Sequence, residues 1–259
     1  MKRPVIGLAL GSGAAKGYAH IGVLQVLERE NISIDIITGS SIGSLIGALY
    51  AAGLALDEIE YLAKNTKRRQ WVDISIQKMG FVAGNKIESL IRSLIQDKNF
   101  DELKIPLGVI ATDLLSKDSV LITEGNVAEA VRASISIPGI FNPVTKGNRL
   151  LIDGGVLERV PGRAARLMGA DIVIGVELGF DDNKRIKNIY DVLFSTFDVM
   201  GREIQSLKKY DCDILITPEL FNIAPMDFNK AEKAIDEGQN SAKKMITKIL
   251  QIIQKAGVT

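Results

Sequence analysis

The sequence predicts an α/β fold, a mostly parallel β-sheet with helices on both faces. Two observations predict this fold and its organisation as one domain. Short apolar runs rich in β-branched residues alternate with longer segments of helical spacing, and this alternation is typical of parallel sheets with helical connections. The 259 residues also contain no internal repeat, no low-complexity tract and no linker rich in proline, glycine or serine. We therefore expect a single domain over residues 1–259.

The expected strands are short runs of mainly apolar residues that would be buried in the sheet. They are Val5–Leu10, Ile34–Ile37, Leu107–Ala111, Val120–Thr123, Asn148–Asp153, Asp171–Glu177 and Asp213–Ile216. The expected helices have apolar residues three and four positions apart. They are a helix with Ile21, Leu24, Val26 and Leu27, the apolar segment Ile42–Ala52 with a mixed-charge continuation to about Thr66, Asn85–Gln96, Val127–Ala133, Ala164–Leu167, Ile189–Leu207 and Lys230–Lys255. The stretch Trp71–Ala83 is less regular.

Composition and charge exclude several classes of protein. The formal net charge of +1 gives no electrostatic basis for binding nucleic acid. With one cysteine, Cys212, and one histidine, His20, the chain has neither an intrachain disulfide nor a structural zinc site. The apolar stretch Leu45–Leu56 is shorter than the ~20 residues of a membrane span, and Val5–Leu10 is shorter than the ~7–15 residues of a signal-peptide core. We therefore expect a cytoplasmic protein without metal or cofactor.

A turn of small residues, Leu10–Gly17, follows the first expected strand and begins a helix. Such a turn places backbone N–H groups and the positive end of a helix dipole where they favour negative charge. Three interpretations stay open from this turn alone. The spacing Gly11-x-Gly13-x-x-x-Gly17 is a loose form of the dinucleotide-binding fingerprint. The N–H groups also suit the oxyanion hole of an acyl-transfer enzyme, and the segment is equally consistent with a tight turn that binds nothing.

A second turn, Gly39-Ser40-Ser41-Ile42-Gly43, follows the second expected strand and precedes an apolar helix. This is the context of a nucleophile elbow, in which a serine lies on a strained strand-to-helix turn with its hydroxyl exposed. The flanking glycines avoid clashes between side chains at such a turn. The alternative is a serine that caps the helix. The order of strand, turn and buried helix favours Ser41 as a nucleophile.

A serine nucleophile needs a neighbouring group that accepts its proton. The single histidine, His20, precedes Ser41 and lies on an apolar helix face, which indicates a structural role. A Ser-x-x-Lys pair is absent, because the residue three positions after Ser41 is another serine. The best remaining candidate is Asp153, which ends an expected strand and is followed by Gly154-Gly155. If its strand ends at the same edge of the sheet, Asp153 would meet Ser41, although a simple turn also explains Asp-Gly-Gly.

These three elements together resemble the patatin-like phospholipase family. In that family a glycine-rich loop with a basic residue, Gly-x-Ser-x-Gly and Asp-Gly-Gly follow one another, as Ser12–Gly17, Gly39–Gly43 and Asp153–Gly155 do here. Four further stretches resemble its compact bacterial members: GYAHIGVLQVLE (Gly17–Glu28), ATDL (Ala111–Leu114), ASISIPGIFNPV (Ala133–Val144) and GADIVIGVEL (Gly169–Leu178). The resemblance extends to about residue 220.

The resemblance implies a three-layer α/β/α sandwich and a Ser-Asp dyad that cleaves acyl esters of lipids through an acyl-enzyme. It implies that Ser41 is the nucleophile and Asp153 the base, and that the N–H groups of Gly13 and Ala14 hold the oxyanion. By analogy with nucleophile elbows, the N–H of Ile42 joins them.

The remaining motif residues would support this site. Lys16 and Gly17 match the basic residue and the glycine that close the family's first loop. The chain departs from the family at Ser12 and Ala14, where glycine is common, and at Ser40, where threonine is common. None of these changes removes a reacting group.

Two other functions are kept as alternatives. One is a nucleotide-binding oxidoreductase that uses Gly11–Gly17, although no tyrosine of the chain has a lysine four residues later. The other is a non-catalytic lipid-binding or regulatory relative. A lipid substrate implies transient contact with a membrane surface, for which the amphipathic segments Ile189–Leu207 and Lys230–Lys255 are candidates, although packing on the domain is the favoured role of both. The sequence indicates no oligomeric state.

Overall fold

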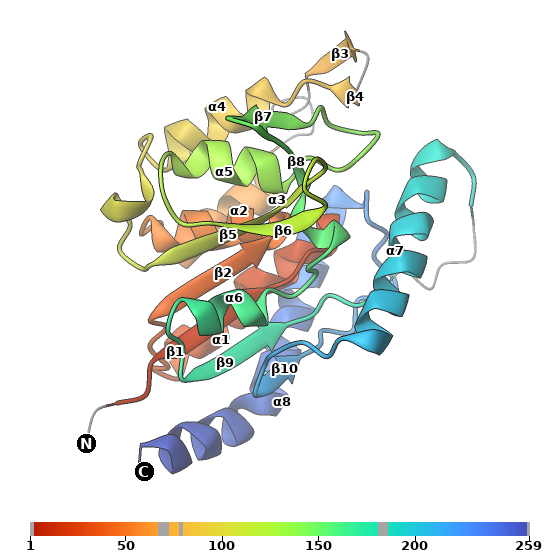
Figure 1. The fold of residues 1–259 in the computed structure, drawn as a ribbon. Coiled ribbons are helices and arrows are strands. Elements are labelled where there is room, and N and C mark those ends of the chain that lie inside the picture. The colour runs from red at the N-terminus through yellow and green to blue at the C-terminus, as the bar shows by residue number, and fades with distance from the viewer. Residues whose placement is uncertain (1–2, 67–72, 78–79, 181–185, 258–259) are drawn as a thin grey trace.

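The computed structural model describes residues 3–66, 73–77, 80–180 and 186–257. In this part of the chain, the centre of the molecule is an eight-stranded sheet (Figure 1). The strands follow the order β10-β9-β1-β2-β5-β8-β7, and β6 also pairs with β5. Their bounds are β1 Ile6–Leu10, β2 Ile36–Ser40, β5 Leu107–Asp113, β6 Asp118–Ile122, β7 Val144–Lys146, β8 Arg149–Asp153, β9 Ile172–Val176 and β10 Ile214–Ile216. A separate hairpin pairs β3 Ile74–Gln77 with β4 Gly80–Val82.

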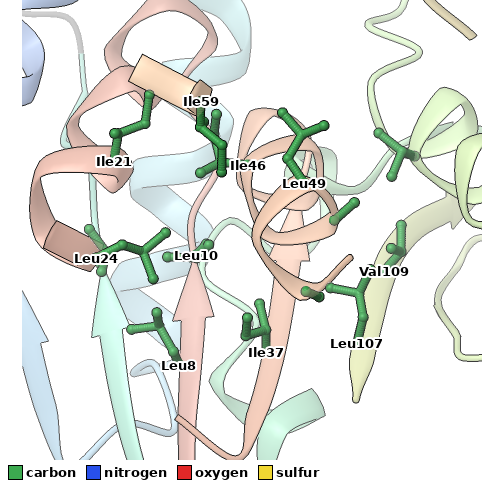
Figure 2. Packing of buried hydrophobic residues seen from close by; sticks show 14 of the residues in the cluster. Leu8, Leu10, Ile21, Leu24, Ile37, Ile46, Leu49, Ile59, Leu107 and Val109 are labelled. Carbon is green, nitrogen blue, oxygen red and sulfur yellow. The ribbon is translucent and has the colours of Figure 1, made fainter. Parts of the chain in front are cut away.

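Helices cover both faces of the sheet, as predicted, and give three layers. Their bounds are α1 Ala19–Arg29, α2 Ile42–Ala51, α3 Leu56–Asn65, α4 Asn85–Leu94, α5 Val127–Ser134, α6 Gly162–Leu167, α7 Ile189–Leu207 and α8 Ala231–Ala256. On one face, sheet residues such as Leu8 and Ile37 pack with α1, α2, α3 and α8 in the larger core (Figure 2). On the other face, Ala9 and Ile36 pack with the short helix α6 in a smaller cluster. The alternation of side chains along each strand divides them between these two cores.

The direction of the strands changes across the sheet. From β10 to β5 every pairing is parallel, which is the arrangement that the alternating sequence predicted. Beyond β5 the pairings with β6 and β8, and the pairing of β8 with β7, are antiparallel. The expectation of a mostly parallel sheet therefore holds for its centre, and the edge that carries Asp153 is antiparallel.

Most expected elements are present, with shifted ends. The helix Ile189–Leu207 has the bounds that the sequence predicted. Strand β2 runs through Gly39 to Ser40, so the first half of the elbow belongs to the sheet. Strands β3, β4 and β7 were not predicted, because runs of only three or four residues are too short to give a clear pattern. Parts of the stretch expected to be less regular, residues 71–72 and 78–79, lie outside the described residues.

The two long helices near the end of the chain differ in how they are packed. Helix α8 lies against α1, where a Cβ on Gly238 would be only 2.0 Å from the carbonyl oxygen of Ala19. This confirms packing as the role of that amphipathic segment. Helix α7 stands at the side of the sheet (Figure 1), and several of its large apolar residues are exposed: Ile189, Val192, Val199, Met200 and Leu207. None of the helices in the described ranges is both long enough and apolar enough to span a membrane.

Candidate active site

Ser41 lies on a strained turn between β2 and α2. Its φ of 52° and ψ of −124° lie in a region that residues with a Cβ rarely adopt, and such a conformation costs on the order of 1–3 kcal/mol. A hydrogen bond fixes the turn, because the N–H of Ser41 donates to Oγ of Ser134 at 2.9 Å. Ser134 in turn donates its hydroxyl proton to the carbonyl oxygen of Ile110 at 2.5 Å. The elbow that the sequence predicted is thus present and is connected to both α5 and β5.

The glycines of the elbow leave room for close backbone contacts. A Cβ on Gly43 would be 2.1 Å from the carbonyl oxygen of Leu10, and one on Gly39 would be 2.4 Å from Cα of Ser44. Both distances are far shorter than van der Waals contact. The Gly-x-Ser-x-Gly pattern therefore follows from how tightly α2 folds back on the ends of β1 and β2.

Asp153 faces Ser41 across the end of the sheet. Oγ of Ser41 donates a hydrogen bond of 2.6 Å to Oδ2 of Asp153, and the N–H of Gly155 donates to Oδ1 at 2.8 Å. Both Ser41 and Asp153 are buried, with 5% and 6% of their surface exposed. Burial raises the pKa of Asp153 to about 6, against the opposing effect of its two hydrogen bonds. The carboxylate therefore takes up a proton more readily than an ordinary aspartate.

Strand registers explain why these two residues meet. On one edge of β5, Ser40 pairs with Ile110 and Asp153 pairs with the next residue, Ala111. The opposite edge of β5 is occupied by β6. Strands β2 and β8 therefore lie on the same edge of β5, run in opposite directions and meet at their carboxyl ends. Asp153 does reach Ser41, but the reason differs from the expected one, because β8 is antiparallel to its neighbour β5.

The glycine-rich loop Gly11–Gly17 lies beside the dyad. The N–H groups of Gly11 and Ser12 donate to the carbonyl oxygens of Val176 and Arg159. In the hydrogen bonds of turns and loops among the described residues, no acceptor is seen for the N–H groups of Gly13 and Ala14. Gly13 and Ala14 line a cavity together with Ser41 and Asp153. Ala14 has a φ of 50°, so the Cβ at this position does not prevent the left-handed conformation.

The N–H of Ile42 is the first of α2, where helices lack intrahelical acceptors. Ile42 packs against the loop, since a Cβ on Gly17 would be 2.2 Å from its side chain. Lys16 is buried, and its ammonium group donates to the carbonyl oxygen of Phe180 at 3.0 Å. Gly13, Ala14 and Ile42 thus all lie close to Ser41.

The two glycines after Asp153 are held as closely as those of the elbow. A Cβ on Gly154 would be 2.2 Å from the carbonyl oxygen of Ile110, and one on Gly155 would be 2.5 Å from Oγ of Ser12. The Asp-Gly-Gly motif therefore packs closely against β5 and against the glycine-rich loop.

His20 has the structural position that the sequence indicated. Its ring is completely buried, and Nε2 lies 2.8 Å from the carbonyl oxygen of Gly11. Burial lowers the pKa of His20 to about 4, so the ring is neutral near pH 7 and Nε2 carries the proton that Gly11 accepts. His20 thus supports the glycine-rich loop, and the carboxylate beside Ser41 is that of Asp153.

Sequence reasoning missed the support that the end of α5 gives to the dyad. Ser134 holds the N–H of Ser41, and the carbonyl of Ser136 accepts the N–H of Asp153 at 3.0 Å. Arg132, which is buried, donates to Oγ of Ser136 at 2.6 Å. All three residues are in or beside the stretch ASISIPGIFNPV. Only the resemblance of that stretch pointed to it, because serines in a helix show no local pattern of function.

Two cavities meet at Ser41. The first, of about 70 Å³, has a mixed lining in which Lys16, Arg159 and Asp198 lie beside apolar residues such as Phe194 and Phe197, and the guanidinium of Arg159 lies 3.2 Å from the carboxylate of Asp198. The second, of about 140 Å³, lies along α2, α3 and α4. Ser41, Ala14 and Ile137 line both cavities. In the described ranges no group of histidine, cysteine or acidic side chains is arranged to hold a metal.

The fold and this geometry define an α/β protein with a buried serine–aspartate pair at a strand-to-helix elbow. The model of the patatin-like phospholipase family matches residues 8–166. This match covers more than half of the chain, which therefore belongs to that family.

Several known proteins are similar to this chain. An uncharacterized NTE family protein of Mycobacterium tuberculosis is 41% identical over 178 residues, which are 68% of this chain and 49% of that protein. Patatin-like phospholipase domain-containing protein 7 of Mus musculus is 32% identical over 201 residues, 73% of this chain but 14% of that protein. The chain thus spans about half of the mycobacterial relative and a small part of the mouse protein.

A solved structure shares the fold. The crystal structure of VipD from Legionella pneumophila superposes with a TM-score of 0.70 over 96% of this chain and 67% of that chain. Sequence identity is 12%, so the likeness concerns the fold alone.

Proposed function

We propose that the protein hydrolyses acyl esters of lipids. The hydroxyl of Ser41 attacks the ester carbonyl while its proton passes to Asp153. Collapse of the tetrahedral intermediate forms an acyl-enzyme, and the alcohol leaves with the proton from Asp153. Water then loses a proton to the same carboxylate and attacks the acyl-enzyme, which releases the fatty acid and restores Ser41.

The observation that carries this proposal is the 2.6 Å hydrogen bond from Ser41 to a buried carboxylate. A serine hydroxyl is a weak nucleophile unless a positioned base accepts its proton. Asp153 can act in this way because burial raises its pKa to about 6, closer to the operating pH at which a general base is most effective. The name of the family supports a lipid as the substrate.

The oxyanion of the tetrahedral intermediate needs donors that are fixed before the reaction. We assign this role to the N–H groups of Gly13 and Ala14, with the N–H of Ile42 as a third donor. Ser12 of this loop packs against Gly155, and Lys16 donates a hydrogen bond to the carbonyl oxygen of Phe180. Both contacts help to hold the loop in place. The neighbouring helix N-terminus of α2 adds favourable dipole charge.

Labelling with a fluorophosphonate probe tests the nucleophile. We expect the wild-type protein to be labelled, Ser41→Ala to lose labelling, and Asp153→Asn to react slower by a factor of about 10² to 10⁴. Ser40→Ala is the matched control, because Ser40 is the adjacent serine and its buried hydroxyl has no partner among the described residues. It should be labelled like the wild type.

The same experiment separates the alternatives. A Ser41→Ala variant that is labelled and hydrolyses esters as the wild type does would contradict the proposal. A folded wild-type protein that is never labelled would favour a non-catalytic lipid-binding relative. The dinucleotide-binding alternative has less support, because Gly13 and Ala14 line the cavity of Ser41 and Asp153, and a titration with dinucleotide that shows saturable binding would revive it.

A lipid substrate also requires contact with the surface that presents it. We propose that this protein is cytoplasmic and that it contacts the lipid surface transiently through α7. The outer row of this helix exposes Ile189, Val192 and Val199. On the same helix, Phe194 and Phe197 line the first cavity beside Ser41. An exposed apolar row on a helix next to the catalytic cavity fits an interfacial helix.

A further inference from the structure

The second cavity is chemically different from the first. Most of its wall consists of aliphatic and aromatic side chains, and Ser41 lies on that wall. The first cavity has a mixed lining, in which Lys16, Arg159 and the carboxylates of Asp153 and Asp198 share the wall with apolar side chains. Because both cavities are lined by Ser41, an ester carbonyl held at this serine would extend one arm into each.

Three helices each turn an apolar stripe towards the second cavity. The residues are Ile42, Leu45, Ile46 and Leu49 of α2, Ile59, Leu62 and Ala63 of α3, and Ile87, Leu90, Ile91 and Leu94 of α4. On α2 the stripe begins beside Ser41 and continues for two turns, about 10 Å along the helix. The cavity is therefore a slot that leads away from the nucleophile, and its walls lie on regular helices.

Protein interiors seldom leave such a space unfilled. Packing in cores is as dense as in organic crystals, and few voids exceed the size of one water molecule. The second cavity, of about 140 Å³, is partly open to solvent, and its volume is close to the ~150 Å³ of engineered apolar cavities that bind benzene. An apolar space of this size beside a nucleophile is thus suited to an apolar ligand.

We propose that the slot under α2, α3 and α4 binds the acyl chain of the ester, and that the alcohol part lies in the first cavity, where the charged side chains of Lys16 and Arg159 are found. This inference rests on the proposed function and adds the direction in which the substrate is bound. It makes the protein selective for esters with an extended apolar acyl chain over acetyl esters. It also assigns Ala63 as a determinant of the length of acyl chain that the slot accepts. Ala63 has the smallest side chain that the three helices contribute to the wall.

A substitution that fills the slot tests this assignment. We would measure kcat/KM of Ala63→Phe on p-nitrophenyl acetate, butyrate, octanoate and palmitate. Each buried methylene contributes ~0.8 kcal/mol, about fourfold in affinity, so excluding even two of them should lower octanoate and palmitate hydrolysis by about tenfold or more. Acetate hydrolysis should change by less than about twofold, because the dyad is not touched.

The matched control is Ala55→Phe, which adds the same ring at an exposed position just before α3 that does not line the slot. It should keep the wild-type preference. If Ala63→Phe does not fold, Ala63→Met replaces it, because methionine is flexible and a good helix former.

The outcomes separate this inference from the function on which it rests. A shift towards short chains in Ala63→Phe or Ala63→Met, but not in Ala55→Phe, supports the slot. An active enzyme whose ratio of palmitate to acetate hydrolysis is unchanged by filling the slot overturns the inference alone. A folded wild-type protein that hydrolyses no ester and reacts with no fluorophosphonate overturns both.

Discussion

At the scale of single residues, the proposed dyad depends on groups that line neither cavity. Ser41 adopts a strained φ of 52°, which persists only where neighbours hold it. Ser134 supplies this support through its hydrogen bonds to Ser41 and Ile110. The backbone of Asp153 is held by Ser136, whose hydroxyl is bound by Arg132. The end of α5 thus positions both Ser41 and Asp153.

Removing the hydroxyl of Ser134 should reduce kcat more than it changes KM. Ser134→Ala leaves the buried N–H of Ser41 without a partner, at a cost of about 1–3 kcal/mol, and we expect kcat to fall by roughly 10- to 100-fold. Ser134→Thr keeps the oxygen and should recover most of this rate. Steady-state kinetics with thermal melting check the prediction. A loss of melting temperature with unchanged kcat would show that Ser134 is merely structural.

The pH dependence of the reaction should report Asp153. Its carboxyl must be ionised to accept the proton of Ser41, and its pKa is about 6. The rate of fluorophosphonate labelling should therefore be constant near pH 7 and 8 and fall by about tenfold per pH unit well below pH 6. A profile that stays flat down to pH 4 would exclude Asp153 as the base.

The same raised pKa affects stability in the opposite direction: activity should rise with pH, whereas the contribution of Asp153 to stability should fall. Because the pKa of Asp153 in the folded state is above the ordinary value of about 3.9, the folded state binds more protons between about pH 4 and pH 6. This group alone therefore lowers the free energy of unfolding as pH rises through that range. Asp153→Asn removes the buried charge, so it should melt no lower than the wild type at pH 7.

At the scale of secondary structure, the connection after β8 sets the distance between Ser41 and Asp153. Gly154 lies so close to β5 that a Cβ would be 2.2 Å from the carbonyl oxygen of Ile110. Any larger residue must push the end of β8 away from β5, and Asp153 is the residue before it. The packing of this glycine is thus linked to the hydrogen bond of the dyad.

Gly154→Ala should consequently impair both stability and catalysis. Overpacking of this kind costs about 1–3 kcal/mol, and we expect a lower melting temperature together with a fall in kcat, because Oδ2 moves away from Ser41. Gly257→Ala, at the end of α8 where the nearest atom is 3.5 Å away, is the control. Wild-type melting and kinetics in Gly154→Ala would show that the backbone adapts freely.

The sequence predicted the positions of the helices and strands better than it predicted whether neighbouring strands run parallel or antiparallel. Periodicity identified the helices and the central strands, and motif spacing identified Ser41 and Asp153 as candidates. Periodicity does not encode which strands pair, so the antiparallel course of β8 was not foreseen. Neither was the role of Ser134, because its partner Ser41 is 93 residues away and hydrogen bonds over such separations leave no local pattern.

At the scale of the whole molecule, we propose that α7 determines which side meets a lipid surface. Helix α8 is packed on α1 and offers no comparable surface, whereas α7 exposes Ile189, Val192 and Val199 beside the catalytic cavity. Docking through this row would bring the first cavity close to the lipid.

Charges placed on this row should separate two activities. We expect the double variant Val192→Glu with Val199→Glu to sediment less with phospholipid vesicles and to hydrolyse vesicle lipids more slowly. Hydrolysis of a soluble short-chain ester should be unchanged, because neither residue lines a cavity. Lys243→Glu with Lys248→Glu on α8 is the control. Equal loss on the soluble ester would indicate damage to the site, and wild-type vesicle binding would exclude α7 as the contact.

The meeting of β2 and β8 on one edge of β5 also makes activity a reporter of partial unfolding. Asp153 is 112 residues from Ser41 in the chain, and its strand is joined to β5 over Ala111–Asp113 only. Short pairings of this kind open more easily than the longer pairings in the core of a sheet. A brief detachment of β8 would silence the enzyme while the parallel centre stays folded. The fraction of active molecules at a given temperature is then set by the free energy of this local opening, which is smaller than that of complete unfolding.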